Sequence, residues 1–434
     1  MIVVKKKYFN LAIILLSFLF SCKKDDVNGP VIKFNTPAEN QTYNVYDPVT
    51  VNASVSDETK ISSISVSLVD AQQNPAHVTI AVPVTGSSMT FNILYILDNI
   101  HLESGQYFIL ISASDGKNDS HAYQKINIIA VPKVLKKIYV TSKTSGLQTN
   151  LSAVDSAFAT IVPIHNFTGD YIGSCVSSYY QQGYMCGNYT GNFQGIDLSN
   201  SNVKFSFSPI VSSNPYFTGF YNDDKTNYVS RYDGFIKGYD YLGNVVYGAT
   251  TLTDYYSEHI CFNNSYLISE QQDITSSAKM LVTYFPTSSL EKNCFLSQDV
   301  VAFCEKDVSD VFVFGNSAGQ GVIQLFDRIN NNLWSPYPFP LAAGTVLSAV
   351  KIDPDTYLIG HSNGTIYKYQ YSSSSLTTYL SGYTAVQLKY DDLTNEIYVV
   401  EANKISTFDY TSTALHHSVN SVETILGINL LYNR

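Results

Sequence analysis

A histidine and a cysteine stand two positions apart in the segment Glu258-His259-Ile260-Cys261. Alternate side chains of a β-strand point to the same face, so His259 and Cys261 could form half of a tetrahedral zinc site. No second pair follows at a matching spacing, and a histidine packed in the core is the favoured interpretation. The pair His416-His417 is expected in an exposed turn, with metal binding as the less favoured alternative. The sequence therefore predicts no metal site.

Acidic residues gather at expected strand ends in the first third of the chain. Asp57-Glu58, the segment Asp115 to Asp119, and Glu39 could together supply the oxygen ligands that calcium prefers. The full acidic pattern of calcium-binding modules is missing, however, and Asp, Asn and Gly also form turns by themselves. We therefore predict no cofactor, with calcium as the alternative.

Three acidic clusters recur later in the chain, each after an expected first strand of a repeat: Asp223-Asp224, Asp353-Pro354-Asp355 and Asp391-Asp392. This recurrence predicts a role in turns rather than in catalysis. The sequence contains no Gly-x-Ser-x-Gly elbow, Walker loop, dinucleotide fingerprint or His-Glu-x-x-His motif. Two carboxylates for glycoside hydrolysis could come from distant positions, but nothing in the sequence selects a pair. We assign no catalytic residue, and the ligand-binding residues stay unassigned.

Tyrosine is the remaining candidate for binding, since the chain contains 34 tyrosines. Aromatic side chains at one face would suit sugar rings or a protein partner. For any single tyrosine, packing within a sheet is the favoured explanation, because β-strands are rich in tyrosine. The tyrosines near expected turns or strand starts are Tyr179, Tyr180, Tyr184, Tyr189, Tyr216, Tyr221, Tyr255, Tyr256 and Tyr337.

Five cysteines follow Cys22 in the chain. Cys175 and Cys186 could face each other across a hairpin, where a disulfide and two buried thiols are both open interpretations. Cys175, Cys261 and Cys304 occupy similar places in the first strands of three repeats, which favours packing in an inner ring.

The elements that must position these side chains are strands of a repeating unit. Leu347 to Leu380 contains four strand-like runs, which are separated by Asp-Pro, Asn-Gly and serine turns. The pattern recurs about every 40 residues, the period of a propeller blade. Six complete units lie between about residues 170 and 422, while three strands at 137–164 and a lone strand at 425–432 make a seventh. Pairing of the first and last strands would close the ring, although six or eight blades stay open.

Residues 31–131 are predicted to form a separate all-β domain with seven short strands, which is typical of an immunoglobulin-like sandwich. Gly105-Gln106-Tyr107 is similar to the tyrosine position of such folds. The fold class predicted for the chain is thus all-β, with this sandwich followed by a seven-bladed β-propeller over residues 135–434.

Two resemblances extend this interpretation. Lys137-Ile138-Tyr139-Val140-Thr141, followed by Leu151 to Asp155, resembles the YVTN type of propeller repeat, which implies architecture and no particular activity. Residues 1–21 resemble a lipoprotein signal peptide, because three lysines precede a short apolar run and Leu19-Phe20-Ser21-Cys22 resembles a lipobox. This implies lipidation of Cys22 and a tether over residues 22–30. Lys23-Lys24-Asp25-Asp26 resembles the export signal of Bacteroidota surface lipoproteins, which implies a lipid anchor in the outer membrane and exposure at the cell surface.

Composition limits the partners. Removal of residues 1–21 deletes three lysines and no acid, which takes the net charge from −10 to −13 and argues against nucleic acid as a partner. The sequence predicts a non-enzymatic binding or scaffold protein for a protein partner or a glycan. The alternative is an extracellular enzyme acting on polysaccharide, which a convergent cluster of acids and aromatic residues at one end of the propeller would favour.

Overall fold

The structure is a computed structural model, and it describes residues 28–145, 147–337 and 341–434. The predicted signal peptide, Cys22 and most of the predicted tether lie outside these residues. Every regular element in the described ranges is a β-strand, which confirms the all-β prediction. Within the same ranges, no helix has the length and apolar character needed to cross a membrane. The chain divides into two compact units between Pro132 and Lys133.

The first unit consists of two β-sheets that enclose one hydrophobic core. One sheet has the order β1-β3-β6 and the other the order β2-β8-β7-β4-β5, in which only β2 and β8 are parallel. Alternation explains the core, because every second residue of β3 from Val49 to Val55 is fully buried. The strands are β1 (Val31–Thr36), β2 (Gln41–Asn44), β3 (Pro48–Ser56), β4 (Ser63–Val69), β5 (Ile80–Val82), β6 (Ser88–Ile96), β7 (Gly105–Ser114) and β8 (Asp119–Ile129).

All seven strands expected in this unit are present, and β2 is an additional one. The sequence of β2, Gln-Thr-Tyr-Asn, has no apolar alternation, so the sequence pattern did not reveal this strand. Backbone pairing to β8 holds it in place. Tyr107 lies at the start of β7, where its hydroxyl donates a hydrogen bond to the backbone oxygen of Glu103 (3.2 Å).

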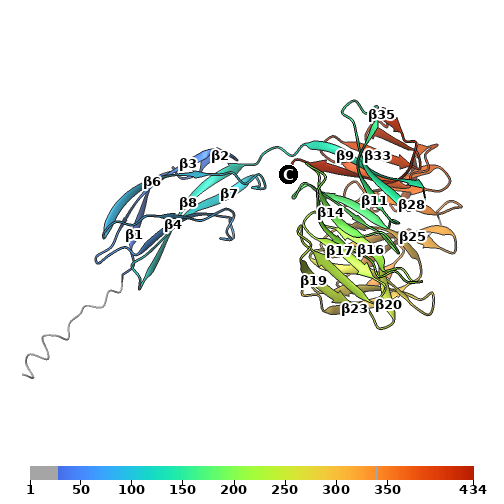
Figure 1. Cartoon of the computed structure of the whole chain (residues 1–434), viewed down its shortest axis with the longest axis horizontal. Coiled ribbons are helices and arrows are strands. Elements are labelled where there is room, and N and C mark those ends of the chain that lie inside the picture. The colour runs from blue at the N-terminus through green and yellow to red at the C-terminus, as the bar shows by residue number, and fades with distance from the viewer. Residues whose placement is uncertain (1–27, 146, 338–340) are drawn as a thin grey trace, which may run out of the picture. The chain divides into compact units, whose positions relative to one another are not determined.

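Among the described residues, the second unit consists of seven antiparallel sheets of four strands each (Figure 1). The unit predicted at Leu347 to Leu380 is the sheet β28–β31. In spatial order the sheets are β36 (Thr424–Tyr432), β9 (Leu135–Ser145), β10 (Gln148–Val154), β11 (Ile161–Thr168); β12 (Gly173–Ser177), β13 (Gln182–Cys186), β14 (Phe193–Asp197), β15 (Val203–Phe207); β16 (Phe217–Asn222), β17 (Asn227–Arg231), β18 (Phe235–Tyr239), β19 (Val245–Thr250); β20 (Tyr255–Asn263), β21 (Tyr266–Asp273), β22 (Lys279–Tyr284), β23 (Leu290–Leu296); β24 (Asp299–Glu305), β25 (Asp310–Ser317), β26 (Gln320–Asp327), β27 (Asn332–Trp334); β28 (Val346–Lys351), β29 (Thr356–His361), β30 (Thr365–Gln370), β31 (Ser375–Ser381); and β32 (Gln387–Asp391), β33 (Glu396–Glu401), β34 (Lys404–Asp409), β35 (Leu415–Asn420).

The first strand of each sheet contacts the first strand of the next, in the order β36, β12, β16, β20, β24, β28 and β32. The last sheet returns to the first one through contacts of β33 with β36. This circular order is that of a β-propeller. The predicted closure is confirmed, because β36 pairs with β9, with Ile428 opposite Val140. Closure pairs β9 on both of its sides, and β36 becomes the first strand of this sheet.

The turns of the propeller fall at two ends, because neighbouring strands within each sheet are antiparallel. We call one the crossover end; it carries the loops that join second to third strands and the connections from sheet to sheet. The other is the terminal end, where Leu135 and Tyr432 pair and where first strands turn into second strands. The recurrent acids lie at the terminal end in turns, as predicted: Asp223 and Asp353 each accept two backbone N–H groups of their own turn.

Candidate functional site

A cluster of four charged side chains lies at the crossover end, on four different strands. The ammonium group of Lys279, at the start of β22, lies 2.7 Å from Oε1 of Glu270, 3.0 Å from Oε2 of Glu258 and 3.0 Å from Oδ1 of Asp299. Glu270 is fully buried in β21, and its Oε1 also accepts a hydrogen bond from the backbone N–H of Val300. Lys279 thus joins three carboxylates that are far apart in the sequence.

A β-bulge in β20 brings Glu258 and His259 to the same place. Pairing between β20 and β21 passes from Ser257 opposite Gln271 to Ile260 opposite Ser269. Glu258 and His259 therefore both stand opposite the single residue Glu270. Bulges re-aim side chains and are common beside functional sites. As a result, Oε2 of Glu270 lies 2.6 Å from Nδ1 of His259.

The Glu270–His259 hydrogen bond has a defined direction. Burial raises the pKa of Glu270, but His259 and Lys279 outweigh this effect and hold the pKa below its ordinary value. Glu270 is therefore a carboxylate, so His259 donates through Nδ1. This leaves Nε2 as the ring nitrogen that can meet a ligand. The His259 side chain is 46% exposed, whereas that of Glu270 is 0% exposed.

An open pocket of about 440 Å³ adjoins this cluster. We call it the aromatic pocket; the side chains that matter most in its lining are Tyr189, Phe220, Tyr256, Glu258 and His259. The Tyr256 hydroxyl lies 3.4 Å from Oε1 of Glu258. Burial, together with the nearby Glu258 carboxylate, raises the pKa of Tyr256 to about 12, so the phenol stays a hydrogen-bond donor at neutral pH.

Asp170 holds the loop that carries Tyr189. Its carboxylate accepts the backbone N–H groups of Asn188, Tyr189, Thr190 and Gly191 at distances of 2.8, 2.7, 3.2 and 2.9 Å. Burial raises the pKa of Asp170, but these four donors outweigh it and lower the pKa below its ordinary value. The loop is also tight, because a Cβ on Gly187 would lie 2.2 Å from Cα of Gly191. Tyr189 is therefore presented by a preorganised loop.

The structure corrects the prediction for His259, which is half exposed and not a core histidine. Cys261 lies two positions further on, but it packs in the core with Ile268 and Val300 and takes no part in the cluster. His259 and Cys261 therefore do not form the half of a zinc site that was the less favoured alternative. Within the described residues, ligand atoms of three such side chains converge at Glu258, His259 and Glu270, all within 4.8 Å of one another. Both carboxylates of this group, those of Glu258 and Glu270, are already paired with the ammonium group of Lys279.

The other histidine and cysteine predictions also have definite outcomes. His416 and His417 lie in β35 rather than in a turn; His416 pairs with Glu396 (2.8 Å), and His417 stacks on Phe158. Cys175 stands opposite Tyr184 and not opposite Cys186, and both thiols are free. Cys175, Cys261 and Cys304 do lie in first strands, where burial raises the pKa of each thiol.

Two of the acidic residues considered for calcium, Asp57 and Asp115, are engaged in their own turns. Asp57 Oδ1 accepts the backbone N–H groups of Thr59 (2.8 Å) and Lys60 (3.0 Å). Asp115 Oδ1 accepts those of Lys117 and Asn118 in the same way. Each carboxylate thus has the turn-forming role that Asp commonly has.

Two of the tyrosines singled out by the sequence, Tyr189 and Tyr256, line the aromatic pocket. Others pack as sheet tyrosines: Tyr184 is buried, and the ring of Tyr221 stacks on Phe262. The sequence did not single out Glu270 or Lys279. The available signal was weak: Lys279 begins a mainly apolar strand, whereas the neighbours of Glu270 in its strand are Ser269 and Gln271.

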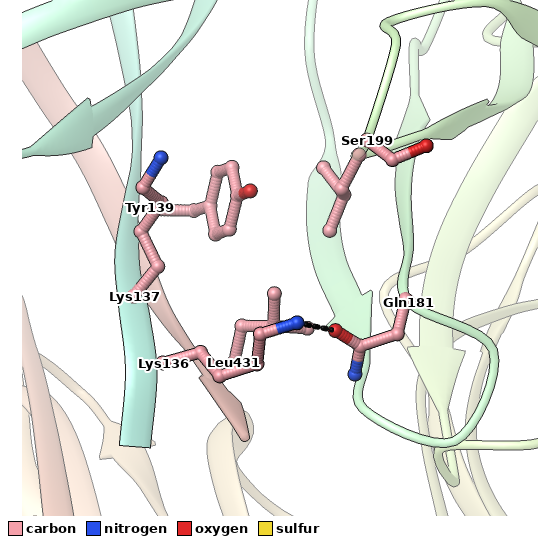
Figure 2. Close-up of a pocket in the computed structure, with 7 residues that line it drawn as sticks. Lys136, Lys137, Tyr139, Gln181, Ser199 and Leu431 are labelled. Atoms are coloured by element: carbon pink, nitrogen blue, oxygen red, sulfur yellow. Dashed lines mark hydrogen bonds between the residues drawn. The ribbon is translucent and has the colours of Figure 1, made fainter. Parts of the chain in front are cut away.

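A second cavity, of about 310 Å³, lies at the terminal end between the first two sheets (Figure 2). We call it the lysine pocket; Lys136, Lys137 and Tyr139 of β9 and Leu431 of β36 line one side. Gln181, Leu198 and Ser199, from two turns of the next sheet, line the other side. Figure 2 shows the Lys136 side chain reaching across to Gln181, where the ammonium group donates to Oε1 (2.8 Å).

No protein-family model matches the sequence, and no curated protein matches it. A quinonprotein alcohol dehydrogenase-like protein from Bacteroides thetaiotaomicron aligns with 14% identity over 94% of this chain and 100% of its own, with a TM-score of 0.48. A chain of the Mitotic Checkpoint Complex aligns with 13% identity over 58% and 78%, with a TM-score of 0.47. The computationally designed Ika8 protein aligns with 12% identity over 66% and 89%, with a TM-score of 0.43. Likeness at this level carries no information on activity or ligand.

Proposed function

We propose that this chain is a surface lipoprotein whose propeller binds a glycan in the aromatic pocket at the crossover end. The lipobox-like Leu19 to Cys22 and the following Lys23 to Asp26 support a lipid anchor and export to the outer surface of a member of the Bacteroidota. Seven four-stranded sheets in circular order support seven blades of the YVTN type. The two-sheet first unit and the Tyr107–Glu103 hydrogen bond support an immunoglobulin-like spacer.

The residues that line the aromatic pocket are the main support for the glycan proposal. Tyr189, Phe220 and Tyr256 supply ring surfaces, while Glu258 and His259 supply hydrogen-bonding groups in the same hollow. A sugar presents C–H faces to aromatic rings and hydroxyl groups to polar side chains, so it needs this mixture. The pocket volume lies within the range of small-molecule sites, roughly 300–1,000 Å³. A protein partner would need a broader and flatter surface than this hollow.

The state of the carboxylates favours binding over glycoside hydrolysis. Acids and aromatic residues do converge at one end of the propeller, as the enzyme alternative requires. A glycosidase, however, needs one carboxylic acid that stays protonated near neutral pH. Glu270 is instead a buried carboxylate with a lowered pKa, and Glu258 shares the ammonium group of Lys279. Glu270 is therefore not set up to protonate a leaving group, and Glu258 is held in an ion pair.

One observation favours a second candidate, an enzyme that uses His259 as its proton-transfer group. A buried carboxylate that holds Nδ1 and leaves Nε2 towards a pocket is the arrangement of a general base. The two candidates differ in turnover. We expect product analysis with a bound glycan to show no cleavage. Cleavage that is lost in His259→Gln, with binding retained, would establish the enzyme instead.

A thermal-shift screen of residues 23–434 against a glycan panel, followed by calorimetry, tests the proposed function. A ligand that binds only the folded state raises the melting temperature. We expect Tyr189→Ala and Tyr256→Ala to weaken the bound glycan at least tenfold. Tyr241→Ala serves as the control, since Tyr241 lies in a turn at the terminal end and stacks on Tyr180. No shift with any glycan, together with a protein crosslinked through this face on intact cells, would replace the glycan by a protein partner.

A further inference from the structure

We infer that the lysine pocket is a second, independent binding site, for a small monocarboxylate with an apolar body. This site lies at the terminal end and shares no lining residue with the aromatic pocket. Its failure in a test would therefore leave the glycan proposal untouched, and the reverse also holds. Three features support the inference: a fixed cation, a lack of neutralising carboxylates, and an apolar wall.

The position of the cation is built into the fold. Nε2 of Gln181 donates to the backbone oxygens of Ser178 (2.6 Å) and Tyr432 (2.7 Å). Two carbonyl groups thus take both N–H donors of the amide, so its oxygen must face Lys136. The backbone of Gln181 has a φ of 53°, in the left-handed region, and the surrounding turn holds it there. Lys136 is therefore held at the pocket by a neutral, rigid acceptor.

The positive charge of Lys136 has no anionic partner in this site. No carboxylate of the described residues forms an ion pair with Lys136 or Lys137, while Lys136 uses one of its three N–H donors on Gln181. The carboxylate nearest in sequence to Leu198 and Ser199 is Asp197, which is occupied by Lys204 (3.0 Å) and by Ser199. Two lysines therefore face the cavity of an acidic protein with their charge available.

The wall of the lysine pocket selects the rest of the ligand. Tyr139 and Leu431 are almost fully buried and belong to the core between the first two sheets, so the cavity ends on apolar surface. An inorganic anion would leave this surface uncovered, and a neutral apolar molecule would leave the ammonium groups unused. A carboxylate on an apolar body satisfies both, because charged hydrogen bonds and apolar burial then act together.

Ligand-observed NMR titration of residues 23–434 with benzoate and with benzamide tests this inference. The two probes have similar shape and differ in charge. We expect benzoate to bind at least tenfold more tightly than benzamide, and more weakly at high salt. Lys136→Met should reduce benzoate affinity at least tenfold. Lys143→Met is the matched control, since Lys143 is an exposed lysine at the other end of β9.

The variants separate a binding defect from a folding defect. Lys136 is exposed, so the melting temperature of Lys136→Met should equal that of the wild type. Equal binding of benzoate and benzamide would overturn the inference, because only the apolar wall would then be recognised. Unchanged benzoate binding in Lys136→Met would also overturn it. Binding of a peptide with a free carboxyl terminus, without binding of benzoate, would reassign the pocket to a protein end.

Discussion

Lys279 and Lys136 are the same residue type at opposite ends of one propeller, and the fold gives them opposite roles. Lys279 is held by three carboxylates, one of them fully buried. Lys136 is held by a neutral amide and faces a cavity. Burial lowers the pKa of Lys279, but the carboxylates outweigh it and raise the pKa above its ordinary value. A lysine is available to a ligand only where the fold leaves its charge uncompensated.

The largest expected effect is a loss of stability when Lys279 is removed from its cluster with Glu258, Glu270 and Asp299. Lys279→Met would leave the fully buried Glu270 without its ammonium partner. Removal of one partner of a buried ion pair costs about 3–5 kcal/mol, because the remaining charge stays desolvated. Urea denaturation of the propeller should show this loss in the free energy of unfolding. A loss below about 1 kcal/mol would mean that solvent reaches the Glu270 carboxylate and replaces the ammonium group.

Asp170→Asn should have the next largest effect. The amide loses the charge that four backbone N–H groups share, and hydrogen bonds to a charged group contribute about 1.5–3 kcal/mol. We expect a loss of about 2 kcal/mol in unfolding free energy, and weaker glycan binding because Tyr189 is no longer fixed. The lysine pocket should be unaffected, so unchanged benzoate affinity is the internal control. Loss of both affinities would show that the two ends are coupled.

Acid should weaken the crossover end in a predictable direction. The folded-state pKa values of Glu270 and Asp170 lie below their ordinary values, so these carboxylates contribute stability above the unfolded pKa near 4. That stability is lost as the pH falls through the folded-state values, at about 1.4 kcal/mol for each pKa unit of difference. Lys279→Met should make this loss smaller for Glu270, because only His259 then opposes the effect of burial on its pKa. Unfolding measured from pH 7 to pH 3 in both proteins tests this decrease.

The smallest expected effect on stability comes from Lys136, which lines the lysine pocket. Lys136→Met should change the free energy of unfolding by less than about 0.5 kcal/mol, as is usual for an exposed side chain without an ionic partner. The same denaturation series as for Lys279→Met gives a direct comparison. A loss as large as that of Lys279→Met would contradict the difference between the two lysines.

Local pattern was enough to predict most of the strands. In Leu347 to Leu380, turn residues separate runs that favour strands, and backbone pairing of neighbours follows directly from such hairpins. Closure of the ring by the last strand was predicted for a similar reason, since three strands at one terminus and one at the other leave only that pairing. The short strand β2 escaped prediction, because backbone bonds to β8 hold it without an apolar pattern.

The strand pattern, the repeat and the abundance of tyrosine could thus be read from the sequence. The pairing of the charged side chains could not, because it depends on how strands and sheets lie against one another. Glu270 and Lys279 lie on neighbouring strands, and a one-residue bulge places Glu258 and His259 opposite Glu270. A bulge changes the sheet face to which a side chain points. The hydrophobic pattern of a single strand does not reveal a bulge, because the bulge depends on the register between two strands. Likewise, Lys136 and Gln181 meet because two sheets pack side by side, a contact that the period of a single repeat does not encode.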